Sequence, residues 1–161
     1  MNTGESLLSV GALLVFSLVS LNFNSNVLQN TTVEVENKVY LTAFSLADDL
    51  IEEVKQKAFD AATIDFPTTN PESLTPSDNL GPGNFEDYPN FNDIDDFNGF
   101  SRGVSAPHAE NYVVSCLVQY VDADNPDNVV STQTFYKKVT VIVTSPYLRN
   151  SIKLSQIFTH K

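Results

Sequence analysis

The segment 90–100, NFNDIDDFNGF, carries the densest group of side chains that could bind a metal ion. Its candidate ligands are Asp93, Asp95, Asp96 and Asn98. Clustered carboxylate and amide oxygens next to a glycine suit a hard cation such as Ca²⁺, although the spacing is not that of an EF-hand. Asp and Asn clusters are also typical of turns in which the side chains cap backbone groups. A Ca²⁺ site and a simple turn therefore both stay open.

The other reactive residues form no catalytic constellation. The segment 99–103, GFSRG, matches the G-x-S-x-G pattern of a nucleophile elbow, but no strand is predicted before it and the chain is too short for that hydrolase fold. His108 and His160 lack the spacing of metal ligands. Cys116 lies in an alternating apolar run, which favours a buried small side chain, and a single cysteine excludes an intrachain disulfide. We expect no enzymatic activity.

A single carboxylate, Glu5, precedes a long apolar run. Residues 6–23 carry no charge, and their only polar side chains are serines and Asn22. This length approaches the roughly 20 residues that a helix needs to cross a bilayer. An acid at the end of such a helix is costly unless a partner neutralises it. A signal peptide or a plain anchor would carry flanking basic residues, and none occurs before Lys38.

Met1, Glu5 and the apolar run that follows resemble the mature N-terminus of a type IV pilin. The resemblance implies that a prepilin peptidase removes a short basic leader and that Met1 is then N-methylated. Glu5 would match the acid of the family and pair with the α-amino group of Met1 in a neighbouring subunit. Such a pair sets the register, because a wrong stagger leaves a bare charge. Cleavage after Gly4 is a rival register that would place Ser9 at the position of the acid.

The resemblance further implies a structural subunit of an extracellular filament, polymerising through its N-terminal hydrophobic helix. The subunit would wait in the inner membrane until a pilus assembly machinery adds it to a homo-oligomeric helical filament on the cell surface. The alternatives are a minor pilin or pseudopilin, and a membrane-anchored envelope binding module that never polymerises. The segment 93–100 also resembles a D-[IV]-D-D-[YF]-x-G-[YF] motif of some pilin-like proteins. A net charge of −11 argues against nucleic acid as a partner.

Two regions are predicted from the distribution of apolar and polar residues. Residues 1–26 should form the membrane-anchor and filament-core helix, and residues 27–161 a globular head. The polar stretch 22–26 weakens the helix, so a break there and a polar turn at the membrane surface both stay open. Apolar residues at helical spacing predict an amphipathic helix over 27–63.

The rest of the head should contain an irregular segment followed by strands. Clustered prolines and carboxylates predict an acidic loop over 64–110. Alternating apolar residues predict strands at 112–121, 134–144 and 152–159 within the region 111–161. The expected fold is α+β: a long N-terminal hydrophobic α-helix, as in pilins, then the irregular acidic loop and a C-terminal antiparallel β-sheet packed on the helix.

Overall fold

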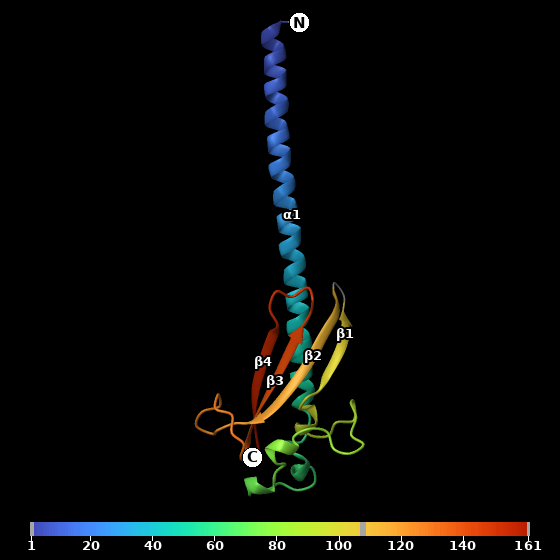
Figure 1. Ribbon diagram of the computed structural model, residues 1–161, viewed down its shortest axis with the longest axis vertical. Helices are drawn as coiled ribbons and strands as arrows, with labels where there is room; N and C mark the ends of the chain where they lie inside the picture. Colours follow the sequence, from blue (N-terminus) through green and yellow to red (C-terminus); the bar gives the residue numbers. More distant parts are fainter. Residues whose placement is uncertain (1, 107–108, 161) are drawn as a thin grey trace. The chain divides into compact units, whose positions relative to one another are not determined.

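The computed structural model describes residues 2–106 and 109–160. The chain divides into two compact units, one ending at Lys38 and one beginning at Val39. Within the described residues the elements are one α-helix, four short 3-10 helices and four strands (Figure 1). They are α1 (Thr3–Val54), η1 (Ala61–Thr63), η2 (Pro71–Ser73), η3 (Ser77–Asn79), η4 (Asp95–Phe97), β1 (Ser101–Ala106), β2 (Ala109–Tyr120), β3 (Tyr136–Thr144) and β4 (Ile152–Thr159).

Helix α1 continues without interruption through the polar stretch 22–26. The Asn22 side-chain amide donates a hydrogen bond to the Leu18 carbonyl at 3.0 Å, and Thr31 Oγ1 donates to the Val27 carbonyl at 2.9 Å. These polar side chains bond to carbonyls one turn earlier and do not compete with the helix for its amide groups. In the single chain this stretch is thus a polar helical turn, and a break in the assembled filament stays a prediction.

The end of α1 differs from the sequence-based expectation. The α-helix stops at Val54 instead of continuing to about Thr63. Beyond it, Ala58 pairs with Asp93 as an isolated parallel bridge, and Lys57 Nζ donates to the Phe91 carbonyl at 2.6 Å. The Ala58 amide donates to the Asn92 carbonyl, and the Ala58 carbonyl accepts from the Ile94 amide. These two bonds to the acidic segment replace helical bonds, so helical spacing in the sequence did not decide the conformation here.

The four strands form one antiparallel sheet in the order β1-β2-β3-β4 (Figure 1). The central pair places Cys116 opposite Val141 and Val118 opposite Val139. The three predicted strands are confirmed with small shifts of their ends. Strand β1 lies within the region predicted to be irregular. Its sequence SRGVSA gave no strand pattern, because it has a single large apolar residue and its side chains are half-buried or exposed. It is an edge strand, which needs little hydrophobic signal.

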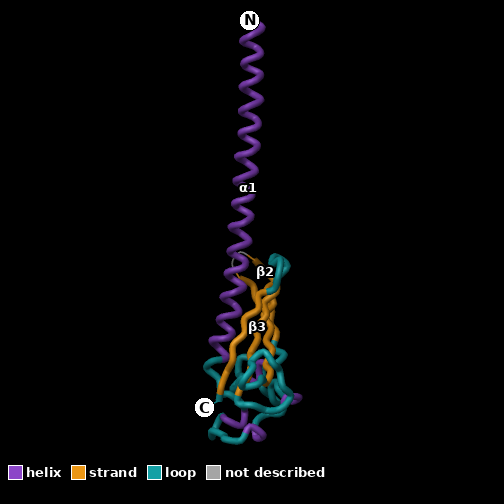
Figure 2. The backbone as a smooth tube through the Cα atoms, turned by 90° about the vertical axis from the view of Figure 1, so that its left-hand side faces the viewer, coloured by secondary structure: helices purple, strands orange, loops and turns teal. Residues whose placement is uncertain are grey.

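The core of the second unit lies between the end of α1 and one face of the sheet (Figure 2). Tyr112 Oη donates a hydrogen bond to the Val39 carbonyl at 3.2 Å, which links β2 to α1. Small residues on the helix, Ala43 and Ala47, allow the sheet to approach closely. The expected α+β fold is confirmed. The α1 residues buried in this core are Val39, Ala43, Ala47, Leu50, Ile51 and Val54, and the sheet supplies Tyr112, Val114, Cys116, Val118, Val139, Val141 and Val143.

The acidic segment packs onto this core through aromatic rings. Phe91 and Phe97 meet edge to face with centroids 5.0 Å apart, and Tyr88 and Phe100 lie 4.9 Å apart. Such ring pairs add stabilisation beyond the area they bury. The segment is therefore held in place although it has little regular structure.

Candidate functional site

The first unit presents an apolar surface that nothing in the described chain covers. Leu7 is 76 % exposed, Phe16 72 % and Phe23 70 %. None of the most apolar 18-residue window of α1 is buried. Among the described residues, α1 is the one helix long and apolar enough to cross a membrane, a criterion that signal sequences and soluble core helices also meet. A contiguous apolar surface of this size marks a contact with lipid or protein.

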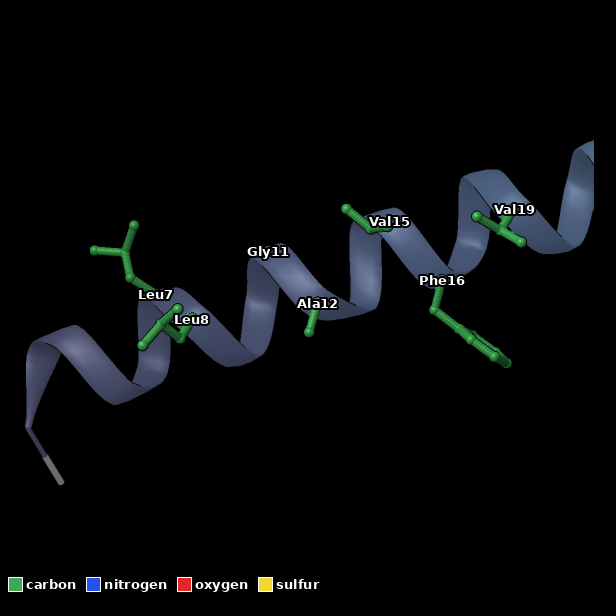
Figure 3. Close-up of a pocket in the computed structure, with 7 residues that line it drawn as sticks. All are labelled: Leu7, Leu8, Gly11, Ala12, Val15, Phe16 and Val19. Carbon is green, nitrogen blue, oxygen red and sulfur yellow. The ribbon is translucent and has the colours of Figure 1, made fainter.

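This surface has a shallow hollow at its N-terminal end. Figure 3 shows the residues along a single stretch of α1. Gly11 and Ala12 lie between larger side chains, which is an arrangement that lets apolar helices approach closely. The residues lining the hollow are Leu7, Leu8, Gly11, Ala12, Val15, Phe16 and Val19.

Polar side chains inside the apolar run bond to their own helix. Ser9 Oγ donates to the Glu5 carbonyl at 2.9 Å, and Ser17 Oγ donates to the Leu13 carbonyl at 2.8 Å. These two hydroxyls therefore need no water, so they can enter an apolar medium with their donors paired.

Glu5 lies in the first turn of α1 and is exposed. A carboxylate there faces the positive end of the helix dipole, which is favourable. Within residues 2–106 and 109–160, no hydrogen bond or ion pair to its carboxylate is found. Met1, predicted to be its partner in a neighbouring copy and the site of methylation, lies outside the described residues. The predicted pair therefore stays a prediction.

The predicted Ca²⁺ ligands lie in and beside η4, and the protein itself engages one oxygen of each. Asp93 Oδ1 accepts a hydrogen bond from the Asp95 amide at 2.7 Å, and Asp96 Oδ2 accepts from the Asn92 amide at 2.8 Å. Asn98 Oδ1 accepts from the Val118 amide at 3.0 Å, which fastens the segment to β2.

These contacts favour one of the two interpretations left open by the sequence. In the part of the chain that the structure describes, no three His, Cys, Asp or Glu side chains are placed to hold a metal ion. Backbone amides and a lysine already take up one oxygen each of Asp93, Asp95, Asp96 and Asn98, and the Ca²⁺ site stays a prediction. The alternative interpretation, a turn whose side chains cap backbone groups, describes the segment.

The lysine is Lys137, on β3, and its side chain is completely buried. Its Nζ donates to Asp60 Oδ2 at 2.7 Å, to Asp95 Oδ1 at 2.6 Å and to the Phe59 carbonyl at 2.9 Å. The ammonium thus has an acceptor for each of its three hydrogens. It also lies 4.5 Å from the Phe59 ring centroid and 5.2 Å from that of Tyr120. We call Lys137, Asp60 and Asp95 the buried triad.

Asp60 is the most strongly held carboxylate of the triad. It accepts hydrogen bonds from the amides of Ala62 and Thr75 and from Tyr120 Oη as well as from Lys137. Burial acts to raise the pKa of Asp60, but the hydrogen bond and charge of Lys137, with these amides, outweigh burial and lower the pKa to about 2. Asp60 is therefore ionised at neutral pH in the folded protein.

Asp95 and its neighbour Asp93 behave in the opposite way. Burial raises the pKa of Asp95 to about 7, although Lys137 acts against that rise. Burial, assisted by the charge of Asp96, raises the pKa of Asp93 to about 6. Asp95 Oδ2 is buried without a hydrogen-bond partner within the described residues. Asp60 and Asp95, which share Lys137, thus differ sharply in pKa because Asp60 receives more hydrogen-bond donors than Asp95.

Sequence reasoning missed Lys137 as a buried residue, although the sequence carried a signal. Lys137 has the same parity as Val139, Val141 and Val143, which the alternation places on one face of the strand. All four are buried in the structure. A lysine in phase with the core residues of a strand predicts a buried charge, which requires carboxylate partners elsewhere in the chain.

The remaining reactive residues have structural surroundings. Cys116 is buried as predicted, and burial raises the pKa of its thiol to about 12, which suppresses nucleophilic reactivity. Ser101 of the G-x-S-x-G match is the first residue of an edge strand and not the tip of a strand-to-helix turn. His160 stacks against Phe59 and Phe135, and His108 lies outside the described residues.

The exposed apolar row of α1 and the buried triad are thus the two features that invite a functional explanation. No protein-family model, curated protein or solved structure matches this chain.

Proposed function

We propose that this protein is a structural subunit of an extracellular filament, which polymerises through the apolar part of α1. The observation that carries the proposal is the combination of Glu5 in the first turn with a fully exposed apolar run behind it. The same segment holds the subunit in the membrane before assembly and packs against its copies afterwards. The resemblance to type IV pilins rests on these residues.

The energetics support such a dual role. Burying a Leu, Val or Phe side chain contributes roughly 1.5–3 kcal/mol. Residues 6–23 consist mainly of such side chains, and all the large ones are more than half exposed in the single chain. A subunit leaving the lipid must therefore recover this burial against other copies. Gly11 and Ala12 provide the close approach that helix packing in a filament core needs.

Glu5 supports a filament more than a simple anchor. A membrane anchor has no use for an acid at the head of its apolar run, and the acid makes insertion costlier. In a filament the carboxylate has a use, because pairing with an amino group of a neighbouring copy selects one stagger over the others.

A second candidate function is a membrane-anchored module of the cell envelope that stays monomeric. The second unit favours it in one respect, since its core is closed by its own helix and sheet. Such a module would need the apolar run only as an anchor. The two candidates therefore differ in what they require of Glu5.

The deciding experiment is electron microscopy of cells that make the protein, with N-terminal sequencing of any filament recovered. We expect filaments whose first residue is Met1, carrying a methyl group. Glu5→Ala should remove the filaments while the amount of protein in the membrane fraction stays unchanged.

Asp124→Ala is the matched control, because it removes an exposed acid from a loop of the second unit. It should leave filament number unchanged. Normal filaments from Glu5→Ala would refute the register argument, and abundant membrane protein without any filament would favour the monomeric anchored module.

A further inference from the structure

The buried triad contains the groups that an amide bond between two side chains requires. These are an amine, a carboxyl group in contact with it and a second carboxylate in contact with the same amine. We propose that Lys137 Nζ condenses with the side-chain carboxyl of Asp95 to form an isopeptide bond, with Asp60 accepting the released proton. The inference does not depend on the proposed filament.

Contact and enclosure favour the reaction. Nζ lies 2.6 Å from Asp95 Oδ1, and both side chains are at least 97 % buried. Holding two reactants at contact distance replaces an encounter in solution with a reaction inside one molecule. The rings of Phe59 and Tyr120 lie beside Nζ. Condensation also removes the Lys137 ammonium charge from an apolar centre, where charges are costly.

Asp95 is the carboxyl group that the amine can best attack. A neutral carboxylic acid is a better electrophile than a carboxylate, and burial raises the pKa of Asp95 to about 7, so the neutral form is well populated at neutral pH. Its Oδ2 has no hydrogen-bond partner within the described residues. The loss of this oxygen as water therefore breaks no hydrogen bond.

Asp60 is suited to the other role. Its two oxygens receive hydrogen bonds from Thr75 and Tyr120 in addition to Lys137, so Asp60 is ionised and free to accept a proton. The same bonds weaken it as a base, so it holds that proton only transiently. An anion in contact with the ammonium can accept the proton that must leave before the amine attacks. If Lys137 attacked Asp60 instead, the Asp60 oxygen that left as water would break hydrogen bonds to its donors. The departure of Asp95 Oδ2 breaks none within the described residues.

The reaction balances without any further reagent. A proton passes from the Lys137 ammonium to the Asp60 carboxylate, and the neutral amine attacks Cγ of protonated Asp95 to form the C–N bond. A second proton from nitrogen passes to Oδ2, the C–O bond breaks, and one water leaves. The products are the amide, water and protonated Asp60, which then releases its proton to solvent. No atom is oxidised or reduced.

The bond would join η4 to β3 and close a loop between positions 42 residues apart. With one cysteine the chain has no intrachain disulfide. An isopeptide bond would constrain the unfolded chain in the same way as a disulfide of similar span.

Mass spectrometry of the full-length protein, purified in detergent, tests the proposal. A protease that cleaves after Glu separates Asp60 in peptide 54–72, Asp95 in peptide 87–110 and Lys137 in peptide 111–161. We expect peptides 87–110 and 111–161 to be joined, with a mass lower than their sum by one water. Separate peptides from the folded wild-type protein would overturn the proposal, and peptide 54–72 joined to 111–161 would overturn the choice of Asp95.

Two variants sharpen this test. Lys137→Arg keeps the charge but cannot form this amide, so its peptides should be separate. Asp60→Asn keeps both bonding partners and removes the proton acceptor, so the link should form at least about 100-fold more slowly. Cells harvested at the same time should then yield little joined peptide. Asp60→Asn protein linked as completely as the wild type would exclude Asp60 from the reaction.

Discussion

The two units of this chain use the same helix in opposite ways. In residues 3–38 the large apolar side chains of α1 are exposed, whereas from Val39 to Val54 the apolar face is buried in the core of the second unit. The first unit is a surface without a partner, and the second is a core with its own sheet. Helix formation alone therefore says nothing about burial, which depends on what lies against the helix.

The units also differ in how they treat charge. Residues 6–23 are free of charge, whereas the second unit buries a lysine together with Asp60, Asp93, Asp95 and Asp96. Buried charges are weak stabilisers but penalise any wrong arrangement, because each misplaced partner leaves a bare charge. We infer that specificity in the second unit comes from the buried triad. In the proposed filament, Glu5 would have the corresponding role.

The largest expected effect is the dissolution of the filaments by detergent, which would show that the first unit depends on contacts with other copies. If its apolar surface forms a filament core, detergent should dissolve the filaments, because detergent covers that surface in place of other copies. High salt should leave them intact, since the subunits carry a net charge of −11 and repel one another over a screening length of about 8 Å at physiological salt. Sedimentation followed by gel analysis measures the fraction that stays assembled.

The opposite outcome would be equally informative. Filaments that dissolve in salt and survive detergent would be held by polar contacts of the second unit. The apolar surface of the first unit would then not be the main filament contact, and the second unit would not be independent of its copies.

Lys137→Met should be the most damaging single substitution in the second unit. It leaves Asp60 and Asp95 buried without their shared cation, and breaking a buried ion pair costs about 3–5 kcal/mol relative to the unlinked wild-type protein. All six tyrosines lie after Lys38, so tyrosine fluorescence during urea unfolding reports on the second unit alone. Lys138→Ala is the neighbouring control, because its partner Asp127 is 93 % exposed, and it should change stability little.

A pair of substitutions on one helix compares the two units directly. Leu50→Ala opens a cavity in the core and should lower the free energy of unfolding by about 2–5 kcal/mol. Leu14→Ala removes the same atoms from a side chain that is 61 % exposed. The free energy of unfolding followed by tyrosine fluorescence should therefore equal that of the wild type. Equal losses from both substitutions would show that the two units unfold as one.

The pH dependence of stability should be smaller and should belong to the second unit. Asp93 has a pKa of about 6 in the folded protein, above its ordinary value of 3.8, so the folded state binds more protons between these values. Stability is therefore complete below about pH 4 and is lost as pH rises through about 6, by up to about 3 kcal/mol. Asp93→Asn should remove the part of this loss that Asp93 causes when unfolding is followed by tyrosine fluorescence. The part caused by Asp95, whose pKa is raised to about 7, should remain in the unlinked protein.

Asp60 gives the opposite slope at lower pH. Its pKa is lowered to about 2, so its contribution is present above its ordinary value and disappears as pH falls through about 2. Stability should consequently be greatest where these two transitions meet, at about pH 4. Stability that rises steadily from pH 5 to pH 8 would contradict the raised pKa of Asp93.

Local patterns in the sequence determined much of the architecture. The uncharged run 6–23 required an apolar helix, and alternation required the strands near β2, β3 and β4, because each pattern has one secondary structure that places its apolar residues on one side. The burial of Cys116 followed from the same alternation.

Tertiary contacts decided the rest. They ended α1 at Val54, added β1 as an edge strand, and turned the predicted Ca²⁺ ligands towards backbone amides and Lys137. The partners in the buried triad lie 42 and 77 residues apart in the chain. A pattern of neighbouring residues cannot identify such partners, since only the packing of β3 against the acidic segment brings them together and excludes the water that would otherwise compete for their charges.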